Sequence, residues 1–221
     1  MTNILIYGDS NSWGYTDEDA GQKYSNRWPV VFKNFLKQKK ITCNLIEDSL
    51  PGRTTNIDDM VNGKHLNGAS TFKSSLLAHS PIDIVIIMLG TNDLKKRFNR
   101  KPEDISNGLL ELISIADKTF SGKGTWHDQN KSQIIILTPP ALGKLSDEKN
   151  WPNYKEWVGG FQKSKELNES FKAVLNSKKV KLYNCNDIIK SSEIDPIHWS
   201  KNTHHEFGRK FGEFIISSFK L

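Results

Sequence analysis

The strongest constraint on the fold is a nearly unbroken apolar run at residues 82–89, which reads Ile-Asp-Ile-Val-Ile-Ile-Met-Leu. A β-strand that helices cover on both faces has this composition, because neither face meets water. Residues 3–7 and 133–138 are shorter apolar runs of the same kind. Residues 28–38 carry apolar side chains at helical spacing. Strands that alternate with helices predict an α/β domain built on a parallel sheet.

The same patterns locate the remaining elements. We expect strands at residues 3–7, 42–47, 82–89, 133–138 and 179–184. We expect helices at residues 28–38, 71–79, 102–120, 162–176 and 203–219. Residues 49–68 are rich in Pro, Gly, Asn and Asp, and residues 142–160 lack a regular pattern, so both segments are expected to be irregular. No repeat or linker divides the chain, which predicts one domain over residues 1–221.

Composition excludes several classes of protein. The 221 residues are 36% hydrophobic and 25% charged, which suits one globular domain of ordinary size. No apolar run approaches the roughly 20 residues that a membrane span needs. The first seven residues lack the basic start and apolar stretch of a secretory signal, so we expect a cytoplasmic protein. Cys43 and Cys185 form no metal-type pair and are expected to be buried free thiols.

The formal net charge of +6 raises the question of nucleic-acid binding. The lysine-rich segments are short, scattered and without interleaved aromatic residues, which is typical of a solvated surface. They lie at residues 37–40, 95–97 and 178–181. We therefore expect no nucleic-acid partner.

Polar residues follow the first predicted strand directly, as Gly8-Asp9-Ser10-Asn11-Ser12. In an open parallel sheet, functional groups gather outside the carboxyl ends of the strands. A serine on such a strand-to-helix turn directs its hydroxyl into the crevice, where the free N–H groups of the helix favour developing negative charge. The alternative is that Ser10 is an ordinary helix N-cap.

A second candidate motif lies near the C-terminus, as Asp195-Pro196-Ile197-His198. An offset of three residues within one turn brings the Asp195 carboxylate to the Nδ1–H of His198 and leaves Nε2 free to accept a proton. The alternative is a surface histidine beside an unrelated acid.

Two further strand ends carry groups suited to binding an oxyanion. Asn92 follows the most buried predicted strand, and its side-chain amide could donate a hydrogen bond there. Gly52 follows the second strand, and its N–H can approach a ligand closely because no side chain obstructs it. The alternatives are an Asn-rich turn and a plain turn glycine.

Together these four motifs, which follow one another along the chain as Ser10, Gly52, Asn92 and residues 195–198, resemble the GDSL, or SGNH, hydrolase family over essentially the whole chain. The resemblance implies a three-layer α/β/α, flavodoxin-like fold with a five-stranded parallel sheet and helices on both faces. It implies that Ser10 is the nucleophile and that His198 and Asp195 complete the triad. It also implies an oxyanion hole formed by Ser10, Gly52 and Asn92.

Two positions depart from the family pattern. Asn11 stands where leucine is common, and Pro196 stands where glycine is usual. Proline fixes φ, so the turn between Asp195 and His198 must be stiffer here.

A closer likeness is to the arylesterase and acyltransferase (perhydrolase-like) branch of this family. The segments that carry it are residues 12–15, 53–59, 66–70 and 85–93. This resemblance implies an enzyme that hydrolyses short acyl esters and can pass the acyl group to alcohols or peroxide. It also implies a homo-oligomer.

The function we predict is that of a serine esterase acting on short-chain acyl esters through an acyl-serine intermediate, with no cofactor and no metal. The same triad leaves open a thioesterase, a lysophospholipase or a carbohydrate O-acetyl esterase. A more remote alternative is a flavodoxin-like phosphate- or nucleotide-binding module. No Walker-type or dinucleotide-type glycine motif supports that module, and it leaves Asp195 and His198 without a role.

The positions of several aromatic residues and histidines in the sequence predict whether they line the substrate pocket, lie at an interface or face solvent. Trp13 follows the serine motif and Trp199 follows His198, so both are candidates to line the substrate pocket. Trp151 and Trp157 lie in the irregular segment after the fourth strand, where an interface with a second subunit is favoured. The adjacent His204 and His205 are expected on a solvated face of the last helix.

Overall fold

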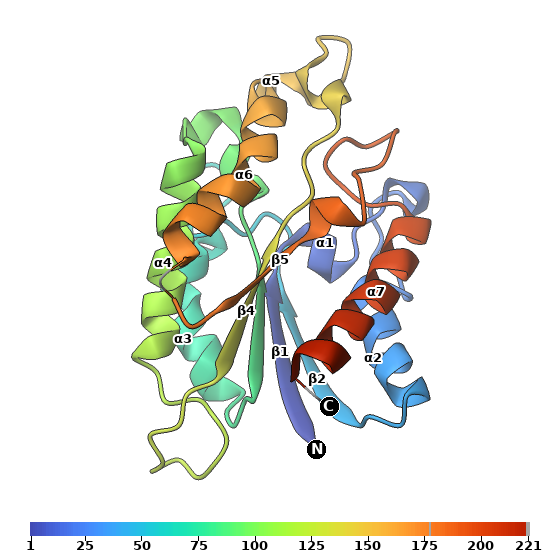
Figure 1. Ribbon diagram of the computed structural model, residues 1–221. Helices are drawn as coiled ribbons and strands as arrows, with labels where there is room; N and C mark the ends of the chain where they lie inside the picture. The colour runs from blue at the N-terminus through green and yellow to red at the C-terminus, as the bar shows by residue number, and fades with distance from the viewer. Residues whose placement is uncertain (177, 220–221) are drawn as a thin grey trace.

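A five-stranded sheet forms the centre of the computed structural model, which describes residues 1–176 and 178–219 (Figure 1). The strand order is β2-β1-β3-β4-β5, and every neighbouring pair is parallel. The strands are β1 (Thr2–Gly8), β2 (Cys43–Ser49), β3 (Ile84–Met88), β4 (Gln133–Thr138) and β5 (Lys181–Asn184). The predicted α/β class and the parallel five-stranded sheet are confirmed.

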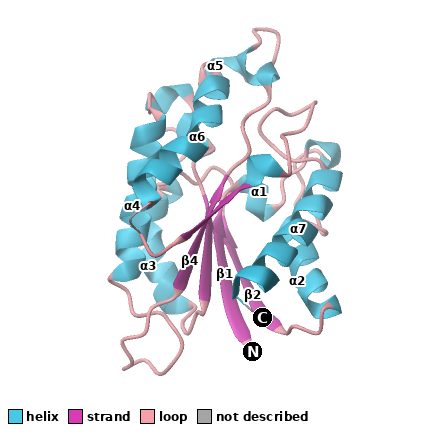
Figure 2. Ribbon diagram, viewed as in Figure 1, coloured by secondary structure: helices cyan, strands magenta, loops and turns pink. Residues whose placement is uncertain are grey.

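Helices cover both faces of this sheet (Figure 2). On one face α2 (Trp28–Gln38) packs against α7 (Lys201–Phe219). The opposite face carries α3 (Gly68–Ala78), α4 (Pro102–Asp117) and α6 (Gly160–Leu175). The result is the three-layer α/β/α arrangement that the family resemblance implies.

The central strands are apolar on both sides because each side meets a helical layer. In β1, Ile4 and Ile6 belong to the cluster beneath α2 and α7, whereas Leu5 and Tyr7 belong to the opposite cluster. All four side chains are fully buried. Successive strand residues point to opposite faces, so a doubly covered strand needs an unbroken apolar run.

The contact between α2 and α7 depends on two small residues of α7. A Cβ atom added at Gly208 would lie 2.7 Å from the Cβ of Val31, and one at Gly212 would lie 2.4 Å from a ring carbon of Phe35. Glycine at these positions therefore lets the two helices approach closely. The aromatic rings of Phe207 and Phe211 stack at 5.5 Å between their centroids beneath this contact.

Most predicted boundaries of helices and strands differ from the observed ones, by at most three residues. Helix α3 begins at Gly68, inside the segment 49–68 expected to be irregular, because the Asn67 side chain accepts a hydrogen bond from the Ala69 N–H and caps the helix. Helix α4 ends at Asp117 rather than at residue 120. The segment expected to be irregular after β4 contains the one-turn helix α5 (Tyr154–Trp157).

Two further predictions concern the burial of the cysteines and the absence of a membrane-spanning segment. Cys43 and Cys185 are both free and buried, as expected. Among the described residues, no helix combines the length and the apolar character that crossing a bilayer requires.

We predict that Phe211→Ala lowers the free energy of unfolding by about 3–5 kcal/mol, because the ring is fully buried and its removal leaves a cavity. Urea denaturation followed by circular dichroism measures this loss. Phe120→Ala is the control, since the Phe120 side chain is 46% exposed. Equal losses for the two variants would contradict the assignment of Phe211 to the core.

Candidate active site

Ser10 lies directly beyond the carboxyl end of β1, as the first residue of the one-turn helix α1 (Ser10–Trp13) (Figure 1). The N-cap of this helix is Asp9, whose Oδ1 accepts a hydrogen bond of 3.0 Å from the Asn11 N–H. Ser10 is therefore not the capping residue, and its hydroxyl is available for another role.

A continuous chain of hydrogen bonds joins Ser10 to the C-terminal motif. Ser10 Oγ lies 3.0 Å from His198 Nε2, and His198 Nδ1 lies 2.6 Å from Asp195 Oδ2. Since an ionised carboxylate only accepts, Nδ1 carries the proton and Nε2 is left to accept from the serine hydroxyl. This arrangement suits transfer of a proton from Ser10 to His198.

The turn that carries Asp195 and His198 is held by hydrogen bonds from backbone N–H groups to the Asp195 carboxylate, and these bonds do not involve the nitrogen of Pro196. Asp195 Oδ1 accepts from the N–H groups of Ile197 at 2.8 Å and His198 at 3.3 Å. Pro196 needs no N–H in this pattern, and its carbonyl accepts from the Gly143 N–H at 2.7 Å. The departure from glycine at position 196 is thus compatible with the close contact between Asp195 and His198.

The charge on Asp195 is stabilised by the groups around it. Burial alone would raise the pKa of Asp195, but the hydrogen bonds from the His198 ring and from two backbone N–H groups hold the pKa below its ordinary value. Asp195 is therefore ionised at neutral pH and accepts the hydrogen bond from His198 Nδ1.

Asn11 links the two halves of the site. Its side-chain Nδ2 donates a hydrogen bond of 3.2 Å to the carbonyl of Ile197, between Asp195 and His198 in sequence. The residue that departs from the common leucine therefore ties the serine turn to the histidine turn.

Tyr15 contacts His198, which the sequence did not reveal. Its ring lies over the imidazole of His198, with 4.0 Å between the ring centroids and an angle of 31° between the planes. Burial and the nearby carboxylate of Asp195 raise the pKa of Tyr15, so the phenol is neutral at ordinary pH. Tyr15 therefore restricts the orientation of His198 from the side of α1.

Asp9 is a buried acid next to the candidate nucleophile. Burial raises the pKa of Asp9 to about 6, although the hydrogen bond from the Asn11 N–H opposes this rise. Nothing in the sequence beyond its place beside Ser10 marked this residue as unusual.

Besides Ser10, the two other candidate oxyanion groups lie in the turns after β2 and β3. Gly52 has φ of +89°, a conformation that favours glycine. Asn92 is buried, and its Nδ2 donates one hydrogen bond of 3.2 Å to the carbonyl of Arg53. A side-chain amide nitrogen carries two hydrogens, so the second one can serve another acceptor.

The two tryptophans expected near the substrate differ in their burial. Trp13 is partly exposed, with the Lys23 ammonium 5.4 Å from the ring centroid, so it can contact a ligand. Trp199 is fully buried in the core and packs on Phe207 at 5.0 Å, so the expectation that it lines the pocket is wrong.

Trp151 and Trp157 also pack within the chain. Trp157 is 6% exposed in the core cluster of α3, α4 and α6, and Trp151 packs against that cluster. The expectation that Trp157 lies at an interface is therefore wrong, because its ring is already covered by this subunit.

His204 contradicts the expectation of a solvated helix face. The side chain is fully buried beside Trp199, and its Nδ1 accepts a hydrogen bond of 3.3 Å from the Trp28 N–H. Burial lowers the pKa of His204 to about 4. His205 is exposed, as expected.

The chain is similar to known proteins both in sequence and in structure. A family model described as "GDSL-like Lipase/Acylhydrolase family" matches residues 6–205. The structure is similar to that of Est24, a carbohydrate acetylesterase from Sinorhizobium meliloti, with 32% identity, a TM-score of 0.87, and coverage of 99% of this chain and 100% of that one. It is also similar to the aryl esterase of M. smegmatis, with 32% identity, a TM-score of 0.85, and coverage of 98% and 99%. No curated protein matches the sequence.

We predict that His204 makes stability depend on pH. The unfolded histidine has a pKa near 6.5, so between pH 7 and pH 4 the unfolded chain takes up a proton that the folded chain refuses. Acidification should therefore lower the free energy of unfolding through this group by at most about 3 kcal/mol. The measurement is urea denaturation at several pH values, comparing wild type with His204→Asn.

The wild type should lose stability relative to His204→Asn as the pH falls. His205→Asn is the matched control on the exposed face and should follow the wild type. If His204→Asn shows the same pH dependence as the wild type, the buried neutral histidine is not the cause.

Proposed function

Because the chain belongs to the GDSL-like lipase/acylhydrolase family, we propose that it is a serine esterase that hydrolyses short-chain acyl esters through an acyl-serine intermediate. The observation that carries this proposal is the chain of hydrogen bonds from Ser10 Oγ through His198 to Asp195. In this proposal residues 1–221 act as one hydrolase domain, since both esterase structures cover at least 98% of the chain.

In the first step, Ser10 Oγ attacks the carbonyl carbon of the ester while His198 Nε2 takes the hydroxyl proton. Asp195 holds the ring in position and stabilises the imidazolium that forms. The carbonyl oxygen becomes negatively charged, and the backbone N–H groups of Ser10 and Gly52 with the Asn92 amide donate hydrogen bonds to it.

The tetrahedral intermediate then collapses. The bond between the carbonyl carbon and the leaving oxygen breaks, and His198 gives its proton to the departing alcohol. A water molecule attacks the acyl-serine with His198 as the base, which releases the acid and restores Ser10. An alcohol or peroxide in place of water would give acyl transfer instead of hydrolysis.

The substrate class we favour is an ester of a short acyl group. The two structures at 32% identity are described as a carbohydrate acetylesterase and an aryl esterase. The first makes a carbohydrate O-acetyl ester the second candidate. As in the branch that the sequence resembles, we propose a homo-oligomer.

A series of p-nitrophenyl esters tests the acyl preference. We expect kcat/KM for the acetate to exceed that for the octanoate by at least about tenfold, because extra methylenes cost binding energy in a pocket built for a short chain. The steady-state rate of p-nitrophenol release measures this ratio. A higher kcat/KM for the octanoate would contradict the proposed substrate class and favour a long-chain lipase.

Replacement of the nucleophile tests the mechanism. Ser10→Ala should lower kcat by about 10⁴–10⁶, because the members of a triad act as one unit. The rate of p-nitrophenyl acetate hydrolysis measures the loss, and Ser12→Ala serves as a control on the same turn. Near-normal hydrolysis by Ser10→Ala would overturn the proposed function.

A further inference from the structure

Two of the three proposed oxyanion groups, Gly52 and Asn92, follow strands that are not neighbours in the sheet. Gly52 follows β2 and Asn92 follows β3, while β1 lies between these strands in the sheet. Sheet hydrogen bonds therefore do not set the position of one turn relative to the other directly. Contacts between the two turns can fix this geometry more directly than the sheet does.

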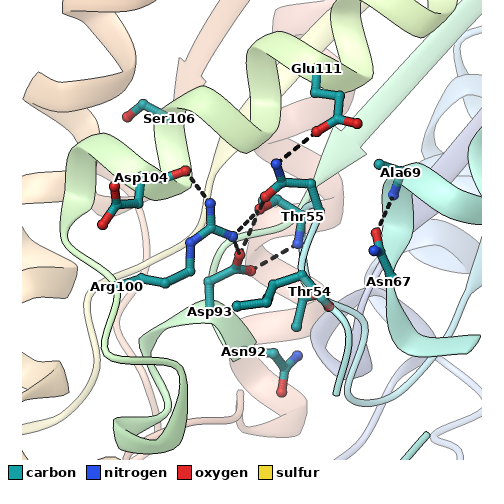
Figure 3. Close-up of polar contacts among 12 residues, drawn as sticks. Thr54, Thr55, Asn67, Ala69, Asn92, Asp93, Arg100, Asp104, Ser106 and Glu111 are labelled. Carbon is teal, nitrogen blue, oxygen red and sulfur yellow. Dashed lines mark hydrogen bonds and ion pairs between the residues drawn. The ribbon is translucent and has the colours of Figure 1, made fainter. Parts of the chain in front are cut away.

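One such contact joins Thr55, in the turn after β2, to Asp93, next to Asn92 (Figure 3). The Thr55 N–H donates to Asp93 Oδ2 at 2.9 Å, and the Thr55 hydroxyl donates to Asp93 Oδ1 at 2.6 Å. Both side chains are fully buried. Two bonds to one carboxylate fix both the distance and the angle between the turns.

Arg100 completes this contact from the segment that precedes α4. Its Nη1 donates to Asp93 Oδ1 at 2.6 Å and to Thr55 Oγ1 at 3.0 Å, and its Nη2 donates to the carbonyl of Asp104 (Figure 3). The guanidinium compensates the charge of the buried carboxylate and, through its second nitrogen, anchors the pair to α4. We call Thr55, Asp93 and Arg100 the loop clamp.

Helix α4 supports the loop clamp at two more points. A Cβ atom added at Gly108 would lie 2.2 Å from Thr55 Oγ1, so the helix backbone packs directly against the threonine hydroxyl. Asn56 Nδ2 donates to Glu111 Oε2 at 2.7 Å, which ties the next residue of the turn to the same helix. Thr55 therefore has little room to move.

Asn92 is held by its neighbour in the loop clamp and by the turn that carries Thr55. Asp93 is its neighbour in the chain, and the carbonyl of Arg53, two residues before Thr55, accepts one hydrogen of the Asn92 amide at 3.2 Å. We propose that Thr55 and Arg100, acting through Asp93, are positioning residues that orient the Asn92 amide toward the oxyanion. This inference rests on the proposed function.

A positioning role makes a specific kinetic prediction. A preorganised donor acts where charge develops in the transition state, so a displaced Asn92 amide lowers kcat and leaves KM nearly unchanged. Thr55→Val removes the hydroxyl but keeps the N–H and the shape, and should lower kcat about tenfold. Thr55→Ser keeps the hydroxyl and should restore kcat to within about threefold of the wild type.

A double-mutant cycle separates positioning from general damage to the fold. Asn92→Ala alone should lower kcat about 10²–10³. In that background the added Thr55→Val should change kcat less than about twofold, because the amide it orients is already absent. The same loss from Thr55→Val in both backgrounds, or a kcat within twofold of wild type for Thr55→Val alone, would overturn the proposal.

The arginines offer a matched pair for the same experiment. Like Arg100, Arg97 pairs with a fully buried aspartate: its Nη2 lies 2.6 Å from Asp59 Oδ2. Its other partner is Glu156, so Arg97 does not belong to the loop clamp. Arg100→Lys should lower kcat in the wild type and not in the Asn92→Ala background, whereas Arg97→Lys should leave kcat unchanged. If Thr55→Val does not fold, as judged by circular dichroism, this pair carries the cycle, and an Arg100→Lys enzyme with wild-type kcat overturns the proposal.

The Ser10→Ala variant distinguishes this inference from the proposed function. If esterase activity depends on Ser10 but the cycle shows no coupling between Thr55 and Asn92, only the positioning role fails. If hydrolysis does not depend on Ser10, the proposed function fails and the positioning role fails with it.

Discussion

The parallel direction of all five strands is the constraint on which the candidate site depends. Parallel strands end at the same edge of a sheet, so the turns after β1, β2 and β3 gather Ser10, Gly52 and Asn92 there. The segment between β5 and α7 returns to this edge and brings His198 to Ser10 (Figure 1). Residues that are 188 positions apart thus share one hydrogen bond.

The turns at this edge are held by carboxylate and arginine pairs rather than by apolar packing alone. Asp93 pairs with Arg100, and the Arg53 guanidinium pairs with Asp48 at 2.8 Å and lies 3.9 Å from the centre of the Tyr7 ring. Buried groups of this kind need their partners, because an unpaired buried charge is costly. Paired charges of this kind are one way to hold functional groups in place on a rigid scaffold.

The sequence predicted best what depends on local pattern. The apolar runs identified the strands, and the three-residue offset from Asp195 to His198 anticipated their contact. It did not reveal the ring of Tyr15 over His198 or the loop clamp, since those contacts join residues far apart in the chain. His204 and Trp199 were misjudged for a related reason: whether a polar or aromatic side chain at the start of a helix faces solvent depends on how the helix packs.

In the proposed mechanism Ser10 is a nucleophile activated by His198. The most direct test of this mechanism is mass spectrometry of the intact protein and its peptides after exposure to a fluorophosphonate, which phosphonylates activated serines. We expect one adduct, on Ser10, that forms rapidly in the wild type, slowly in His198→Ala and not in Ser10→Ala. An adduct on another residue, or equal rates for wild type and His198→Ala, would contradict this mechanism.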